Sequence, residues 1–274
     1  MKPLNSFSDL LAHRSVSGHS VRFDISDDWL QGRTCYGGLI SALAVQAMRD
    51  HAGSAWSADV GLRALQTCFV GPVAPGAVDI HVQLLRQGRH VCQVQAQVRQ
   101  GEQVAAVLLG VFSADRPSTL PQRLPQRPPP RHEAEALPVP PARPMGAPVF
   151  LQHFDMRWAE GPPPYTGGQG WSTCIHLRLN TAEAAAVSSE LQTVLLADLS
   201  PTPVIGHLRQ PSANSSVSWA LELRPVDPGP PEGWWRADNE SLMVDGGYVN
   251  QSARLWAPGG QLAAYGYQVV AVFT

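Results

Sequence analysis

The feature that most constrains the fold is a run of residues, 38–50, that is apolar on nearly every side of a helix. Its apolar members are Leu39, Ile40, Leu43, Ala44, Val45, Ala47 and Met48. Gly37 and Gly38 open the run, and no proline or further glycine interrupts it before Gly53. A helix that is apolar all round is surrounded by other elements rather than packed on one side. The run therefore predicts a long central helix that is wrapped by an antiparallel sheet.

Segments on both sides of this helix have the alternation of half-buried strands. The pattern is clearest where Val78, Ile80 and Val82 are separated by polar residues. The predicted strands of the first half cover residues 19–26, 60–70, 78–87, 90–99 and 104–112. They are enough to form a curved sheet around one helix.

A proline-rich segment interrupts this pattern. Residues 115–148 hold eleven of the 25 prolines of the chain. Proline removes a backbone donor and cannot occupy a central strand or a helix interior, so the segment is expected to be an extended linker. The expected units are residues 1–114, the linker 115–148, and residues 149–274.

The second half repeats the first. A helix is predicted at roughly 182–198, with its central part at 185–198, and strands at 150–158, 170–179, 215–223, 234–244, 248–257 and 261–273. The motif Pro-Val-x-Pro-Gly occurs at 72–76 and 225–229, an offset of 153 (225 − 72). Residues 101–106 match 259–264 at an offset of 158 (259 − 101). One helix-and-sheet unit is thus present twice, which predicts an α+β fold with one continuous sheet.

Three segments carry a resemblance to a known family. They are Tyr36-Gly37-Gly38 at the helix start, Cys68-Phe69-Val70-Gly71-Pro72 at a strand end, and the final strand with Gln268. In this order, and with the repeat, the sequence resembles the double-hotdog acyl-CoA thioesterases, specifically the acyl-CoA thioesterase II-like family. The resemblance covers nearly the whole chain except the linker. It implies two hotdog units and hydrolysis by an Asp, a Thr and a Gln of the second half.

The sequence itself singles out polar residues at apolar positions. Asp198 continues the spacing of Leu191, Val194 and Leu195, and so points with the buried stripe of the helix. It also lies near the helix C-terminus, where the dipole disfavours an anion, and such local violations tend to mark function. The alternative is an Asp that caps the turn at 199–201.

Two strands contribute the other candidates. Ser215 shares the parity of Trp219 and is expected to face inward, with Ser216 as the alternative if the register shifts by one. Gln268 is the only polar side chain on its face from 262 to 272, and a buried amide needs hydrogen-bond partners. By the resemblance, Asp198, Ser215 and Gln268 correspond to the catalytic Asp, Thr and Gln, with Ser in place of Thr.

The expected reaction is the direct attack of water on an acyl-CoA thioester. Asp198 is expected to act as general base or to orient the water, which Ser215 and Gln268 hold. Gly37 and Gly38 are the candidate substrate-binding residues, because backbone N–H groups at a helix N-terminus can stabilise an oxyanion. At the repeat offsets the first half has Leu62 and Gly110, so one active site per chain is expected.

Other features narrow the function classes. The formal net charge of −2 gives no support to nucleic-acid or anionic-membrane binding. The four cysteines are far apart, which is typical of thiols in a reducing compartment, and no apolar stretch approaches the ~20 residues that cross a bilayer. A cytoplasmic protein is expected. Neither a cofactor nor a metal is expected, because dinucleotide, Walker A and HExxH patterns are absent.

One reading remains open beside the thioesterase. The Gly-x-Ser-x-Gly motif of α/β-hydrolases is absent, and no inward Asp/His pair suggests a hydratase. A hotdog that binds acyl-CoA or another acyl ligand without catalysis is the alternative. We also expect a homodimer or a higher homo-oligomer, with Trp234-Trp235 as candidate exposed apolar residues.

Overall fold

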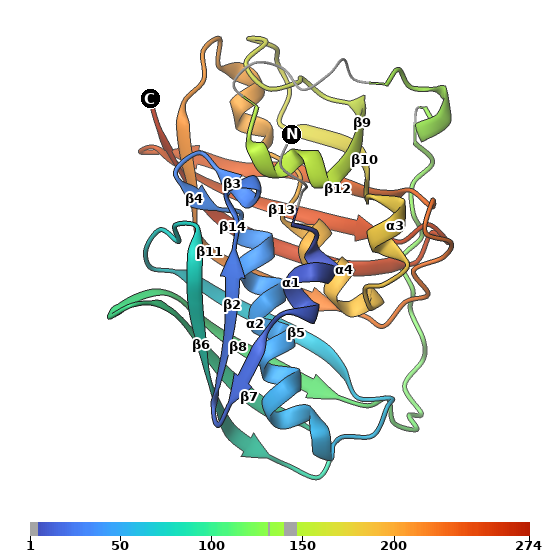
Figure 1. Cartoon of the computed structure of the whole chain (residues 1–274). Helices are drawn as coiled ribbons and strands as arrows, with labels where there is room; N and C mark the ends of the chain where they lie inside the picture. Colours follow the sequence, from blue (N-terminus) through green and yellow to red (C-terminus); the bar gives the residue numbers. More distant parts are fainter. Residues whose placement is uncertain (1–4, 131, 140–146) are drawn as a thin grey trace.

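In the computed structural model, which describes residues 5–130, 132–139 and 147–274, one large antiparallel sheet curves around two helices (Figure 1). Across these residues the sheet has 12 strands in the order β1-β2-β6-β7-β8-β5-β11-β14-β13-β12-β10-β9. The expected α+β class, with two wrapped helices and one continuous sheet, is confirmed.

The N-terminal half contains the predicted strands and central helix. They are β2 (Ser20–Ile25), α2 (Gly37–Ala52), β5 (Gly61–Phe69), β6 (Gly76–Gln87), β7 (Cys92–Gln100) and β8 (Gln103–Ser113). The short elements α1 (Phe7–Ala12), β1 (Ser15–Ser17), β3 (Leu30–Gln31) and β4 (Thr34–Cys35) were not predicted. Each is too short to produce a periodic pattern in the sequence.

The C-terminal half has the same plan with a shorter helix. Its elements are β9 (Phe154–Glu160), β10 (Ser172–Leu179), α3 (Thr181–Ala184), α4 (Ser189–Ala197), β11 (Ala213–Leu223), β12 (Trp235–Asp245), β13 (Tyr248–Trp256) and β14 (Leu262–Phe273). The single helix predicted at 182–198 is divided, because Ser188 caps a new helix by accepting a hydrogen bond from the Leu191 N–H. Residues 150–153, predicted as strand, form a 3₁₀ turn at Val149–His153.

The two halves are related by a pseudo-twofold axis between β5 and β11, which pair in the middle of the sheet. From this pair the strand order is β5-β8-β7-β6-β2 on one side and β11-β14-β13-β12-β10 on the other. Even the register shifts repeat, since bulges at Arg63 and Val217 are 154 residues apart (217 − 63). A second pair, at Leu85 and Leu242, is 157 residues apart (242 − 85).

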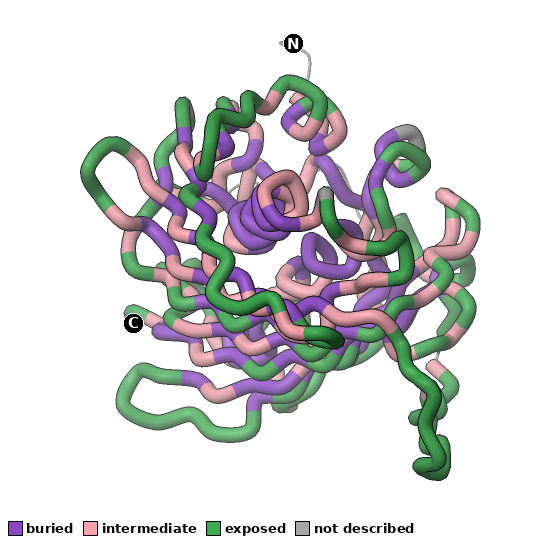
Figure 2. The backbone as a smooth tube through the Cα atoms, turned by 90° about the horizontal axis from the view of Figure 1, so that it is seen from below, coloured by how far each residue is buried: buried purple, intermediate pink, exposed green. Residues whose placement is uncertain are grey.

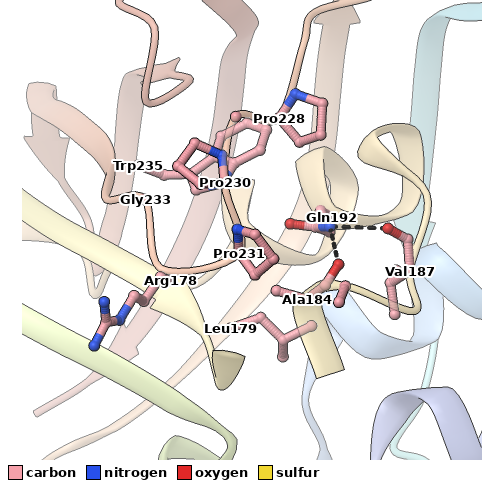
Figure 3. Close-up of a pocket in the computed structure, with 12 residues that line it drawn as sticks. Arg178, Leu179, Ala184, Val187, Gln192, Pro228, Pro230, Pro231, Gly233 and Trp235 are labelled. Carbon is pink, nitrogen blue, oxygen red and sulfur yellow. Dashed lines mark hydrogen bonds between the residues drawn. The ribbon is translucent and has the colours of Figure 1, made fainter. Parts of the chain in front are cut away.

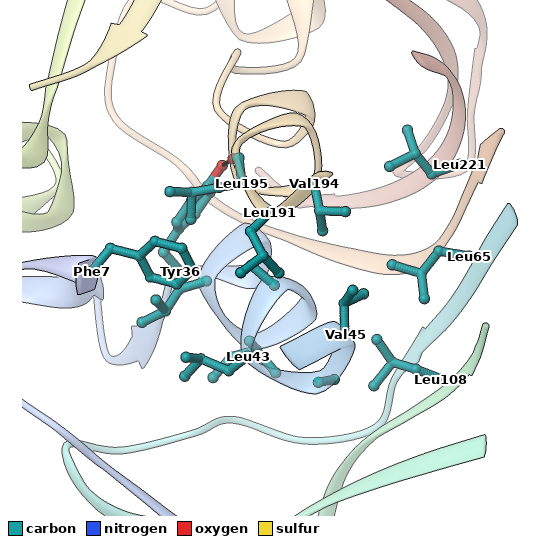
Figure 4. Packing of buried hydrophobic residues seen from close by; sticks show 14 of the residues in the cluster. Phe7, Tyr36, Leu43, Val45, Leu65, Leu108, Leu191, Val194, Leu195 and Leu221 are labelled. Atoms are coloured by element: carbon teal, nitrogen blue, oxygen red, sulfur yellow. Dashed lines mark hydrogen bonds between the residues drawn. The ribbon is translucent and has the colours of Figure 1, made fainter. Parts of the chain in front are cut away.

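The helices α2 and α4 pack antiparallel inside this sheet. At one end Tyr36 Oη donates to the Leu195 carbonyl over 2.6 Å, and at the other Arg49 and Glu190 form a 2.6 Å ion pair. The apolar faces of the two helices meet the inward side chains of the strands (Figure 4). Figure 2 shows the buried coil of α2 in the middle of the molecule, with exposed loops around it. The all-round apolar run therefore is the central helix that it predicts.

The described residues of the linker run along the outer side of the C-terminal half (Figure 1). The Pro128 and Leu137 carbonyls accept hydrogen bonds from Arg236 of β12 and Arg157 of β9, both of 2.6 Å. The prolines 140, 141 and 144 of the predicted linker lie outside the described residues. The unit boundaries at 114 and 149 remain a prediction.

Candidate active site

Asp198 is the residue that ends α4, and its carboxylate faces the first turn of α2. The Gly38 N–H of that turn donates a hydrogen bond to it. The antiparallel packing explains a position that looks unfavourable in the sequence. Asp198 lies at the negative end of its own helix but at the positive end of α2, where backbone N–H groups bind anions.

Gln268 connects Asp198 to the sheet. From β14 its Nε2 donates to Asp198 Oδ1 over 2.9 Å and to Ser216 Oγ over 2.7 Å. Its Oε1 accepts from Gln251 Nε2 of β13 over 2.6 Å. Both Nε2 hydrogens and the carbonyl oxygen are therefore engaged, and the amide links three strands to the end of α4.

The expectation that Ser215 faces inward is wrong. Ser215 is exposed, and its hydroxyl lies 3.4 Å from the Ser216 carbonyl oxygen. Trp219 is buried as expected. The bulge at Val217 adds one residue between Trp219 and the two serines, so Ser216 and not Ser215 lies on the same face as Trp219. The alternative serine, Ser216, therefore meets Gln268.

The surroundings of Asp198 make its carboxyl group a weak acid. Burial raises the pKa of Asp198 to about 7, although hydrogen bonds from Gln268 and Gly38 oppose this shift. Burial, followed by the negative charge of Asp198, raises the pKa of the Tyr36 phenol. A carboxylate with a pKa near neutrality is suited to accept and return a proton at neutral pH.

Neither Gly37 nor Gly38, at the start of α2, has room for a side chain. A Cβ on Gly37 would lie 2.9 Å from Asp198 Oδ2 and 3.2 Å from the Phe69 ring. A Cβ on Gly38 would overlap the Tyr36 phenol. The structure thus places both glycines beside Asp198, while their role in substrate binding remains a prediction.

Gln251 is the residue of this cluster that the sequence analysis missed. It is buried on the β13 face that also carries Val249 and Leu255. A polar side chain on an apolar face is the signal that identified Gln268. The same test applied to residues 248–256 would have found Gln251.

The N-terminal half has an apolar counterpart of this cluster. Leu62 corresponds to Ser216 at an offset of 154 (216 − 62), and both precede the bulge of their strand. Gly110 corresponds to Gln268, and a Cβ there would lie 2.7 Å from Met48 Sδ. The Met48 side chain of α2 therefore occupies the space that corresponds to the Gln268 amide in the other half.

A separate cavity of about 240 Å³ lies between α3, the start of α4 and the loop 228–233 (Figure 3). Gln192 on its wall donates to the Ala184 and Val187 carbonyls, each over 2.8 Å. Neither Asp198, Ser216 nor Gln268 lines it. The cavity is therefore separate from the cluster of polar residues around Asp198.

Two negative findings concern the part of the chain that the structure describes. No group of three or more His, Cys, Asp or Glu side chains there could hold a metal ion. No helix among those residues is long and apolar enough to cross a membrane.

The wrapped-helix repeat defines a double-hotdog protein, and a buried carboxylate lies at the N-terminus of its first central helix. Models of the acyl-CoA thioesterase N-terminal and C-terminal domains match residues 25–113 and 121–272. The chain belongs to the acyl-CoA thioesterase family.

Solved structures agree with this fold. The TesB protein of Mycobacterium avium subspecies paratuberculosis is 17% identical, with a TM-score of 0.71 over 98% of this chain and 100% of that one. The acyl-CoA thioesterase II TesB2 of Mycobacterium marinum is 15% identical, with a TM-score of 0.70 over 97% and 98%. A hot dog protein of unknown function from Alicyclobacillus acidocaldarius is 19% identical, with a TM-score of 0.78 over 98% of both chains. No curated protein sequence matches the chain.

Proposed function

We propose that the protein hydrolyses an acyl-CoA thioester to the free acid and CoA, by attack of a water molecule that Asp198 activates. The observation that carries the proposal is the position of Asp198. Its carboxylate accepts hydrogen bonds from the Gly38 N–H of α2 and from the Gln268 amide, and burial raises the pKa of Asp198 to about 7. Family membership supports acyl-CoA as the substrate.

In this mechanism Asp198 accepts a proton from the water while the water oxygen attacks the thioester carbonyl carbon. The tetrahedral oxyanion collapses and expels the CoA thiolate, which then takes the proton from Asp198. The positive end of α2, at Gly37 and Gly38, is the candidate group that stabilises the oxyanion. No covalent intermediate with the protein is needed.

The hydrogen bonds indicate different roles for Gln268 and Ser216. Gln268 donates both Nε2 hydrogens to Asp198 and Ser216, so it holds these side chains rather than the water. Ser216 accepts from Gln268, which leaves its own hydroxyl hydrogen free to bond the water. In the proposed mechanism Ser216 replaces Ser215 as the counterpart of the family threonine.

The test is CoA-thiol release from acyl-CoA substrates of increasing chain length. Asp198→Asn is expected to lower kcat by about 10²–10⁴-fold, the usual effect of removing a general base. Ser216→Ala is expected to lower kcat, whereas the matched control Ser215→Ala leaves it unchanged because Ser215 faces outward. If folded Asp198→Asn keeps the parent rate, the catalytic assignment of Asp198 is wrong. If the parent releases no CoA thiol from any acyl-CoA, the non-catalytic acyl-binding protein becomes the better interpretation.

Self-association as a homodimer or higher homo-oligomer remains part of the proposal, but the expected support from Trp234-Trp235 is wrong. Trp235 is buried, and the Trp234 ring is covered by the Arg178 guanidinium at 4.3 Å. Among the described residues, the exposed aromatic side chains on β13 and β14 are Tyr248, Tyr265, Tyr267 and Phe273, and Trp171 is exposed before β10.

A further inference from the structure

We propose that Gln251 is a positioning residue for the hydrolysis: it fixes the orientation of the Gln268 amide and so directs Gln268 Nε2 toward Asp198 and Ser216. This inference rests on the proposed function, because it assigns a role within the same site. Gln251 is not expected to contact the substrate thioester or the attacking water.

The geometry of the two amides supports this role. Gln251 and Gln268 are directly opposite in the register of β13 and β14, both are buried, and Gln251 Nε2 lies 2.6 Å from Gln268 Oε1. The two ends of a glutamine amide have nearly the same shape but opposite hydrogen-bonding character. In only one orientation does Gln268 present N–H groups to the Asp198 carboxylate. The donor from Gln251 favours that orientation.

The internal repeat shows that the fold does not require this amide pair. The counterparts in the N-terminal half are Val94 and Gly110, which are also directly opposite in β7 and β8. Their offsets are 157 (251 − 94) and 158 (268 − 110), in agreement with the other repeat offsets. The same sheet position is therefore built from apolar residues in the half without the carboxylate. The amide pair occurs in the half that carries Asp198.

Gln251 is also costly for stability. Its Oε1 is buried and accepts no hydrogen bond from a described protein group. The cavity beside it, about 10 Å³ and lined partly by Ser200 and Asn239, has about the volume that one water molecule needs. A valine, as at position 94, would avoid burying this amide. A locally unfavourable residue that contacts the site is expected to have a functional reason.

The inference predicts an effect on the ionisation of Asp198. The groups that face this carboxylate are the Gln268 amide from β14, the Gly38 N–H of α2 and the nearby Tyr36 phenol. When the Gln251 donor is lost, Gln268 can turn and present its oxygen to Asp198. The ionised form of Asp198 then loses a donor, so the pKa of Asp198 rises further.

The experiment uses Gln251→Met, which keeps the length of the side chain and removes its hydrogen bonds. Two readouts are measured: the pH dependence of acyl-CoA hydrolysis, and the titration of the Asp198 carboxyl carbon by ¹³C NMR. We expect kcat to fall roughly tenfold, the effect of one lost hydrogen bond, with little change in KM. We expect the acidic limb and the NMR titration to move to higher pH. Gln95→Met, the same substitution on β7 of the other half, is the control and should change neither.

A double-mutant cycle separates positioning from a general structural role. In the Gln268→Ala background, Gln251→Met should cause no further loss of kcat, because the residue through which it acts is gone. An additive loss there, or an unchanged kcat and titration in folded Gln251→Met, would overturn the inference. Should Gln251→Met not fold, Gln251→Asn, which withdraws the amide by one methylene, is measured by the same criteria.

Failure of the inference can be distinguished from failure of the proposed function. If Asp198→Asn hydrolyses acyl-CoA like the parent, the proposed role of Asp198 as general base is wrong whatever Gln251 does. The NMR titration of Asp198 does not need turnover, so it tests the effect of Gln251 on the carboxylate in either case. A parent that depends on Asp198 and Gln268 but not on Gln251 overturns the positioning role alone.

Discussion

At the scale of single residues, the ionisation of Asp198 couples the site to stability. The reference pKa of an Asp in an unfolded chain is about 3.9, whereas burial raises the pKa of Asp198 to about 7 in the folded protein. The folded state thus binds more protons than the unfolded state between these values. The stability contributed by Asp198 is complete below the unfolded pKa and is lost as the pH rises through 7.

Asp198→Asn removes this pH dependence, because Asn stays neutral. The free energy of unfolding of the variant, relative to the parent, should therefore increase between pH 5 and pH 8, by roughly 1–3 kcal/mol. Urea unfolding at the two pH values measures it. If the free energies of unfolding of variant and parent differ by the same amount at pH 5 and at pH 8, Asp198 titrates as it does in an unfolded chain.

The sequence predicts individual site residues only where the local pattern is regular. Asp198 and Gln268 were found because each breaks an apolar pattern, and the structure joins them at 2.9 Å. Ser216 was only an alternative, because a bulge depends on the pairing of β11 with its neighbours and has no signature in the alternation of one strand. The Gly38 N–H contact depends on how two helices pack, which no local pattern contains.

At the scale of elements, the site is a junction between the end of α4 and the beginning of α2. The two helices approach so closely that Gly37 has no room for a side chain: a Cβ would lie 2.9 Å from Asp198 Oδ2 and 3.2 Å from Phe69. A Cβ on Gly53, after the other end of α2, would lie no closer than 3.6 Å to any neighbouring atom. The crowding therefore belongs to the site and not to the helix in general.

Gly37→Ala is expected to displace the Asp198 carboxylate and to lower kcat by about tenfold or more, because small misplacements of a catalytic group are costly. Gly53→Ala is the matched control and should leave kcat unchanged. Steady-state hydrolysis with thermal unfolding of each variant distinguishes the two. Full activity in folded Gly37→Ala would mean that the contact between α2 and Asp198 does not position the carboxylate.

At the scale of the whole molecule, the sequence predicts two halves that share one continuous sheet, but not which strands join them. The repeated motifs and the proline-rich segment identify two similar units. The pairing of β5 with β11, with Leu65 opposite Leu221, was not predictable because strand order depends on contacts between the units. The same is true of the ion pair between Arg49 and Glu190, which links the two central helices.

This organisation predicts the result of cutting the linker. Trypsin should cleave first after the exposed residue Arg123, which Leu124 follows, because strands β6, β7 and β8 are held on both sides by hydrogen bonds. The two fragments should elute together under native conditions and retain acyl-CoA hydrolysis, since the β5–β11 ladder and the α2–α4 contact do not depend on an intact linker. Denaturing electrophoresis of the same fractions provides the control for complete cleavage.

Two results would contradict this prediction in different ways. Early cleavage within residues 78–112 would contradict the continuous sheet. Separation of the fragments on native elution would show that the contacts between the halves are too weak to hold them together. In that case hydrolysis should be lost as well, because Gly38 lies in one fragment while Asp198, Ser216 and Gln268 lie in the other. Activity and association should therefore be lost together.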